Sequence, residues 1–264
     1  MKRKYYLGAG IAILCLVIAL IINITHFQKN EQKDAPVVLN TIVAMGGTAV
    51  NTSTRKMEGW FADLLKEKLN IEVRQLYHSY TYDEEYKEKF NRGEIDLYGF
   101  SGSRTYYEQI EEGRLKNLEP YIEEHPEVYS RYKNVIEHIK RHTYKYTGKK
   151  GIYGLPANLD SFEDSREGDE ADCFAIPSSA KHADEAMKLL TWSASEEGIM
   201  NIAFGPEGQM WKKEKGKYVL IKDWREGSPT EKVVKTKYGE LSFYEAVCPM
   251  DLIGNYSLGK ELIK

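Results

Sequence analysis

Apolar residues along this chain fall into two patterns that follow each other in turn, one typical of strands and one typical of helices. Val37 to Met45, Ile71 to Tyr77 and Ile95 to Phe100 are short apolar or alternating runs, the pattern of buried strands. Between them, Met57 to Leu69 predicts a helix with its large apolar side chains inward, and Tyr82 to Asn91 predicts a charged helix. This alternation through short links predicts an α/β fold with a mostly parallel sheet flanked by helices.

Two loops follow the carboxyl ends of the first and third predicted strands. In an open parallel sheet, ligands bind beyond this edge. Gly46-Gly47-Thr48 ends the first strand with a backbone that a ligand can approach closely, and Ser101-Gly102-Ser103 closes the third. We therefore predict ligand-binding residues here that act through backbone approach and hydroxyl hydrogen bonds: Gly46, Gly47, Thr48, Tyr98, Ser101 and Ser103.

The N-terminal residues carry a third pattern. A basic cluster at residues 2–4 precedes an uninterrupted apolar or glycine run from Leu7 to Ile22, which spans roughly 25 Å as a helix. Because such a cluster stays in the cytoplasm, we predict a transmembrane signal anchor over residues 1–24 and a polar tether over 25–36. The main domain, residues 37–264, is then on the extracellular face of the cell membrane. A cleaved signal peptide is the alternative, although no small-x-small site follows the run.

Charge and cysteine content narrow the choice of partners. The chain has 37 Lys and Arg residues against 40 Asp and Glu residues. Five of these basic residues and one acidic residue lie at or before Lys33, so the remainder has a net charge of about −7, which argues against a nucleic-acid surface. Cys173 and Cys248 are the only cysteines beyond the predicted anchor. They either pair in an oxidising space or are two buried thiols, and their spacing does not decide between these.

Motifs that would indicate catalysis or metal binding are each incomplete. Residues 178–181 contain Ser-x-x-Lys without the other elements of penicillin-recognising enzymes, and residues 99–103 lack the second glycine of a nucleophile elbow. His138 and His142 are four residues apart, but Ile139 replaces the glutamate of the metalloprotease pattern. We therefore predict that the protein is not an enzyme and has no cofactor or metal site.

The C-terminal half predicts an amphipathic helix that starts near Ala183. Ser178 or Ser179 is the predicted cap, because a short side-chain oxygen accepts hydrogen bonds from the first amides of a helix. Gly198 lies in a predicted turn that ends this helix.

The segment from Phe174 to Trp211 joins a short apolar run, this helix and a glycine-rich turn in one fixed order. Its pieces are Ala175-Ile176-Pro177, Ser179 to His182, Glu185 to Leu190, Ser195 to Gly198 and Gly205 to Gly208. In order and spacing they resemble the C-terminal signature of the family 1 extracellular solute-binding proteins, the capture subunits of bacterial ABC importers. Earlier segments resemble that family's first lobe and the strand leading to its second: Gly93, Asp96-Leu97, Gly113 to Leu115, Leu118 to Ile122 and Gly151 to Pro156.

This resemblance implies a periplasmic-binding-protein-like lobe that binds a carbohydrate-like solute, a sugar or oligosaccharide, and works with an ABC permease in the membrane. Ring chemistry adds Trp211 to the predicted ligand-binding residues, because tryptophan rings stack on sugar faces. The chain departs from the family at 157–172, where an acidic loop without calcium-loop spacing replaces most of the second lobe. The alternative function is an anchored interaction or sensing module that kept one lobe's fold and has no transport role.

Overall fold

The computed structural model describes residues 35–42, 49–50, 53–76, 84–100, 103–156, 173–221, 233–236, 239–242 and 261–263. The chain divides into two compact units, Met1–Pro36 and Val37–Lys264. The predicted anchor and the acidic loop lie outside the described residues. Among those described, no helix combines the length and apolar character that crossing a membrane requires.

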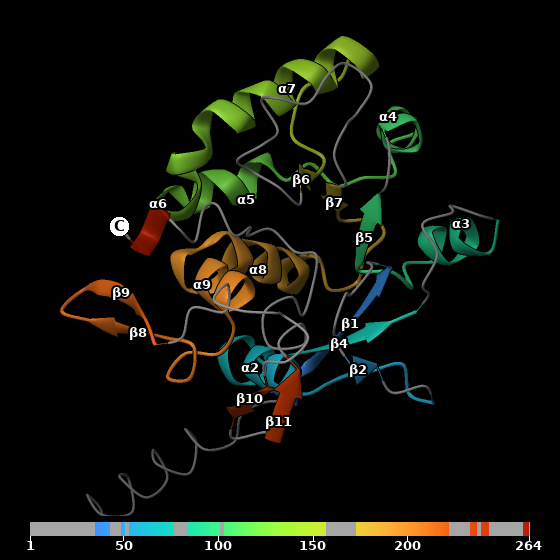
Figure 1. The fold of residues 1–264 in the computed structure, drawn as a ribbon. Helices are drawn as coiled ribbons and strands as arrows, with labels where there is room; N and C mark the ends of the chain where they lie inside the picture. The colour runs from blue at the N-terminus through green and yellow to red at the C-terminus, as the bar shows by residue number, and fades with distance from the viewer. Residues whose placement is uncertain are drawn as a thin grey trace, which may run out of the picture. The chain divides into compact units, whose positions relative to one another are not determined.

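A five-stranded sheet forms the centre of the second unit, in the order β4-β1-β5-β7-β6 (Figure 1). Its strands are β1 (Val37–Ile42), β4 (Ile71–Gln75), β5 (Leu97–Phe100), β6 (Leu155–Pro156) and β7 (Cys173–Ala175). β1 pairs in parallel with both β4 and β5, whereas β7 is antiparallel to both β5 and β6. The predicted α/β class is confirmed, and the parallel part of the sheet is β4-β1-β5.

Helices connect and cover these strands. The longer ones are α2 (Trp60–Leu69), α3 (Glu84–Asn91), α4 (Ser103–Glu111), α7 (Lys133–Thr147), α8 (Ala183–Ala194) and α9 (Glu196–Phe204). Shorter turns, α5 (Glu119–Glu124), α6 (Pro126–Tyr129) and the 3-10 turn η1 (Ser130–Tyr132), lead into α7. The second unit also has three small two-stranded sheets. β2 (Ala49–Val50) pairs with β3 (Met57–Glu58), β8 (Trp211–Glu214) with β9 (Lys217–Leu220), and β10 (Val233–Thr236) with β11 (Gly239–Ser242).

Buried Asp96 joins β1, the start of β5 and the start of α8. Its Oδ2 accepts a hydrogen bond from the Asn40 amide at 2.9 Å, and its Oδ1 accepts one from the His182 amide at 3.0 Å. The Asp96 amide in turn donates to the Asn40 carbonyl oxygen at 2.8 Å. These bonds satisfy a carboxylate that is buried, as a polar group in a core requires.

The predicted helix over Met57 to Leu69 is shorter than the sequence indicated. Met57–Glu58 pairs as β3 with β2, and α2 begins only at Trp60. Gly59 has a φ of +96°, which interrupts the right-handed helical path between the two elements. Asn70 ends the helix in the left-handed conformation, a common C-terminal device.

Two predictions about the C-terminal helices are wrong. The cap of α8 is His182 rather than Ser178 or Ser179, and Asp96 supplies the acceptor for its amide. Gly198 lies inside α9, whose cap Ser195 accepts a hydrogen bond from the Gly198 amide at 3.2 Å. A Cβ at Gly198 would clash with the Trp192 carbonyl oxygen, so glycine is needed because α9 approaches α8 closely there.

The core has one large cluster and two smaller ones. The large cluster packs α2 and α8 against β1 and β4, with Leu39, Phe61, Leu65, Ile71, Met187 and Leu190 among its members. A second cluster lies around Tyr98, and a third joins α9 to the β8–β9 hairpin. Burial of these apolar side chains is the main driving force for the fold.

Candidate functional site

The carboxyl ends of β1, β4 and β5 form the edge at which the sequence predicts a ligand. Gly46, Gly47, Thr48 and Ser101 lie outside the described residues. Ser103 is the first residue of α4, directly after that edge. Of the predicted set, Tyr98 is the residue here whose side chain is described.

Tyr98 is a core residue of β5. Its side chain is 2% exposed, and its ring meets the Phe90 ring edge-on with centroids 5.9 Å apart. Within the sheet, Tyr98 lies opposite Ile42 of β1 on one side and opposite Ala175 of β7 on the other. The ring therefore helps to hold the edge strands together and presents no open face to a ligand in this structure.

Trp211 lies in a different cluster from Tyr98, at the start of β8. It is 1% exposed, its Nε1 donates to the Gly205 carbonyl oxygen at 2.8 Å, and its ring meets Tyr218 edge-on at 5.6 Å. The predicted stacking role requires an open ring face, and this structure covers the ring with the protein's own atoms. Along β8, Trp211 is the one apolar residue and the one buried residue, and the three polar residues after it are exposed.

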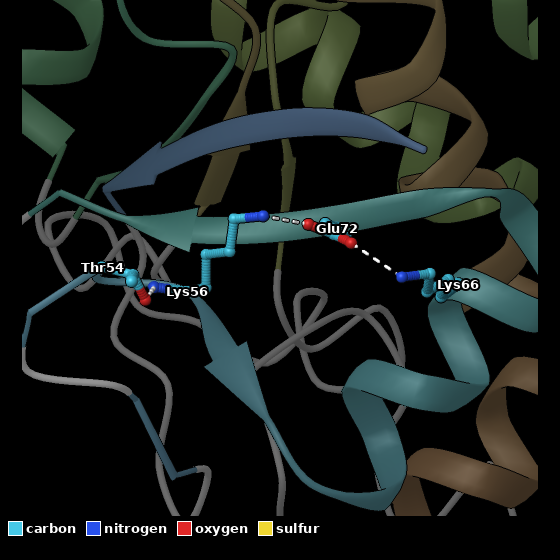
Figure 2. Close-up of polar contacts among 4 residues, drawn as sticks. All are labelled: Thr54, Lys56, Lys66 and Glu72. Carbon is cyan, nitrogen blue, oxygen red and sulfur yellow. Dashed lines mark hydrogen bonds and ion pairs between the residues drawn. The ribbon is translucent and has the colours of Figure 1, made fainter. Parts of the chain in front are cut away.

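Polar contacts around β4 hold the outer strand of the sheet in place (Figure 2). The Gln75 amide donates to the Arg55 carbonyl oxygen at 2.8 Å, which fixes the segment before β3 to the end of β4. Glu72 forms ion pairs with Lys56 and, at 2.9 Å, with Lys66. The hydrogen bond from Lys56, followed by that from Lys66, lowers the pKa of the Glu72 carboxyl group. Partly exposed pairs of this kind add little stability each.

A groove that the sequence did not predict lies between α5–α6 and α8, with a cavity volume of about 810 Å³. One wall is a stripe of α8 residues spaced three or four apart: Asp184, Met187, Lys188, Thr191, Trp192 and Ser195. The other wall has the same spacing through α5 and α6: Asn117, Pro120, Tyr121, Glu124, His125 and Val128. Such spacing places each set on one side of its helical segment.

Three tyrosine hydroxyls hold the two walls side by side. Tyr121 Oη donates to Asp184 Oδ1 at 2.7 Å, and Tyr129 Oη lies 3.1 Å from Thr191 Oγ1. Tyr132 Oη donates to the Ala194 carbonyl oxygen at 3.0 Å. Because the residue numbers of the bonded partners increase together along both segments, the α5–η1 stretch and α8 run in the same direction.

The floor of the groove is apolar and belongs to the main core. Met187 is buried, and the Trp192 ring lies 6.1 Å from the Phe61 ring. Lys188 Nζ donates to the Leu69 carbonyl oxygen at 2.8 Å, which ties the end of α2 to this side of the groove. The floor is thus fixed by packing from three helical segments.

Polar groups gather around Tyr121 at one end of the groove. Burial, then the hydrogen bond to Asp184 and the negative charges of Asp184 and Glu124, raises the pKa of Tyr121 to about 12. Lys116 Nζ lies 6.0 Å from the centre of the Tyr121 ring. Asn117 Oδ1 accepts from the Glu119 and Ile152 amides at 3.1 and 3.0 Å, so its amide nitrogen is left as a donor.

The segments that carry the family resemblance meet in space. Asp96 accepts from His182, as described above, and Leu115 forms an antiparallel bridge with Pro177. The Leu118 amide donates to the Ile152 carbonyl oxygen at 2.6 Å. Motif pieces up to 86 residues apart in the chain therefore form one connected framework.

Within the ranges that the structure describes, no group of three or more His, Cys, Asp and Glu residues could hold a metal ion. His138 and His142 stack on α7 with ring centres 4.1 Å apart. Cys173 lies in β7, and Cys248 lies outside the described residues. The pairing of these cysteines stays open.

Comparisons with known proteins found solute-binding proteins among similar structures. The N-glycan transport solute-binding protein NgtS of Streptococcus pneumoniae in complex with Man5GlcNAc has a TM-score of 0.40 and 10% identity, covering 86% of this chain and 82% of that one. Its Man1GlcNAc complex has a TM-score of 0.39 and 8% identity, covering 85% and 82%. Iron-bound HitA of Pseudomonas aeruginosa has a TM-score of 0.35 and 14% identity, covering 86% and 98%.

No protein-family model matches the chain, and no curated protein matches it. The low identities and TM-scores of the structural likenesses assign neither a family nor a ligand. The resemblance to the family 1 solute-binding proteins therefore stays a prediction made from the residues.

Proposed function

We propose that this protein is a membrane-anchored extracellular solute-binding protein of an ABC importer and that its solute is carbohydrate-like. The observation that carries the proposal is the framework in which motif segments distant in sequence contact one another through Asp96–His182, Leu115–Pro177 and Leu118–Ile152.

The anchor and the permease partner rest on the sequence. The basic cluster at residues 2–4 and the run from Leu7 to Ile22 support a signal anchor with its N-terminus in the cytoplasm. An anchored domain on the outer face would remain close to a permease in the same membrane. The proposal includes no catalytic residue and no cofactor.

Topology makes the carboxyl edge one candidate for the solute site. The contacts there would be Gly46, Gly47 and Thr48 after β1, and Ser101 and Ser103 after β5. The parallel β4-β1-β5 arrangement supports this placement, since parallel strands bring these loops to one edge. Buried Tyr98 and Trp211 would contribute support to the fold rather than a stacking surface.

Calorimetric titration tests the function. The full-length protein, in a detergent without a sugar head group, is titrated with glucose, mannose, galactose, N-acetylglucosamine, maltose and cellobiose. Saturable heat with at least one of these sugars is the expected result. A folded protein that gives no heat with any of them would contradict a carbohydrate-binding function.

The alternative is an anchored interaction or sensing module without transport. It is favoured by the burial of Tyr98 and Trp211, the two aromatic residues of the predicted site. It is also favoured by the short segment at 157–172, where the resembled family has a second lobe that encloses the ligand. Under this alternative, the sugar titration gives no heat although the unfolding transition is cooperative.

A further inference from the structure

The groove between α5–α6 and α8 contains a polar end built around one aromatic ring. We propose that this end binds a pyranose ring and that the groove, rather than the carboxyl edge, is the solute site. The class of solute rests on the proposed function, whereas the position of the site rests on the residues that line the groove.

The Tyr121 ring is held in place by its neighbours. Its hydroxyl donates to Asp184 at 2.7 Å, and the ring is only partly exposed. A ring fixed before binding loses little conformational freedom when a ligand arrives. Aromatic side chains combine a large apolar face with a polar handle, which suits a sugar because one face of a pyranose presents C–H groups.

The charged groups that line the groove are balanced. Lys116 and Lys188 oppose Glu124 and Asp184 on the groove, so these four side chains have no net charge. They therefore supply no excess charge that would select an anionic or a cationic ligand over a neutral one.

The same groups favour a ligand with many hydroxyls. Glu124 and Asp184 carry carboxylate oxygens that accept hydrogen bonds, whereas Lys116 Nζ and the Asn117 amide nitrogen donate them. A hydroxyl group both donates and accepts. A polyhydroxylated ring therefore matches this mixture, and a purely apolar ligand would leave it unpaired.

The groove is large enough for such a ligand. Its volume of about 810 Å³ lies within the range of roughly 300 to 1,000 Å³ that is typical of small-molecule sites. From Asp184 to Ser195 its α8 wall extends about 16 Å. Beyond the polar end, Met187 and Val128 line a more apolar stretch on which a second ring can lie.

Calorimetry with matched variants tests the location. With the sugar that gives the largest heat, Tyr121→Ala should weaken binding about tenfold, because the stacking face is lost. Tyr121→Phe keeps the ring and should weaken binding less. Tyr144→Ala is the control, since Tyr144 is 57% exposed on α7 and does not line the groove. Unchanged affinity in Tyr121→Ala would overturn the inference.

Two neighbouring glutamates on α5 offer a second matched pair. Glu124 lines the groove and Glu123 does not, although both are exposed. Glu124→Gln should weaken sugar binding severalfold through loss of a charged acceptor, and Glu123→Gln should leave it unchanged. Equal effects of the two substitutions would argue against a site at this position.

The experiments distinguish a wrong solute site from a wrong function. If Thr48→Val and Ser101→Ala abolish the heat and Tyr121→Ala does not, the groove inference is overturned and the solute-binding function stands. If no sugar gives heat with the wild-type protein, both are overturned.

Discussion

The carboxyl edge of the sheet and the α5–α8 groove are two candidate sites built in different ways. The edge follows from topology, because β4, β1 and β5 are parallel and end on the same side. The outermost of these strands, β4, is tied at its carboxyl end by the Gln75–Arg55 backbone bond and near its start by partly exposed ion pairs of Glu72. The groove follows from helix packing, with three tyrosine hydroxyls joining its walls and a floor that belongs to the main core.

The pattern of strands along the chain indicates where the carboxyl edge lies, whereas the groove exists only because distant helices pack together. The edge is predictable from the order of elements, but topology alone does not supply a stacking ring there. The groove offers a ring, Tyr121, together with donors and acceptors. Its walls come from segments more than 60 residues apart, so local periodicity does not reveal that they face each other.

The largest expected effect concerns Trp211, which the sequence assigns to the ligand and the structure assigns to the core. Trp211→Ala should lower the free energy of unfolding by about 3–5 kcal/mol, because it leaves a cavity and removes the bond to Gly205. Urea unfolding followed by circular dichroism measures this. Trp211→Phe, which keeps a ring, should cost less. Full stability combined with lost sugar binding would restore the stacking role at Trp211.

A second prediction concerns Asp96, which connects β1 beside the edge to α8 beside the groove. Asp96→Ala leaves the Asn40 and His182 amides without their acceptor, and it should destabilise the fold by about 3 kcal/mol. Exposed Asp63→Ala on α2 is the control and should have little effect. A stable Asp96→Ala variant would show that the two regions are held together by other contacts.

The elements themselves were largely predictable. β1, β4, β5, α3 and α8 lie within the predicted segments or near their predicted starts, because hydrophobic period is a local property of the chain. The wrong details depend on contacts with distant residues. Asp96 replaces a serine cap at α8, and the close approach of α9 to Trp192 places Gly198 inside a helix.

The candidate site was less predictable than the fold. The positions of Thr48 and Ser101 relative to one another remain a prediction, since both lie outside the described residues. The sequence predicts an amphipathic helix here, and Asp184 and Lys188 on that helix are both exposed. It did not show that Tyr121 lies opposite Asp184, because that contact depends on how α5 packs beside α8.

The smallest expected effect concerns Glu72, near the start of the outer strand β4. The pKa of Glu72 is below its usual value of 4.5 in the folded protein, so its ion pairs stabilise the fold above that pH and are lost as the pH falls through the folded pKa. Glu72→Gln should lower stability at neutral pH by less than about 1 kcal/mol. The difference from wild type should shrink between neutral pH and an acidic pH, as the pH falls through the folded pKa of Glu72.

Urea midpoints at the two pH values measure this effect. Glu88→Gln is the control, because Glu88 is highly exposed and its pair with Arg92 is long, at 3.9 Å. A Glu72→Gln penalty that persists in acid would show that Glu72 supports β4 by packing rather than by charge.

Methionine methyl NMR is the most direct test of where the solute binds. Met187 lines the groove, and Met45 immediately precedes Gly46 at the carboxyl edge, so the two methyl groups report on the two candidate sites separately. Each signal is assigned by Met→Leu substitution, and the sugar that gives heat is added to saturation. If the groove is the solute site, the Met187 signal shifts and the Met45 signal does not. A shift of Met45 with Met187 unchanged would contradict the groove site and place the solute at the carboxyl edge.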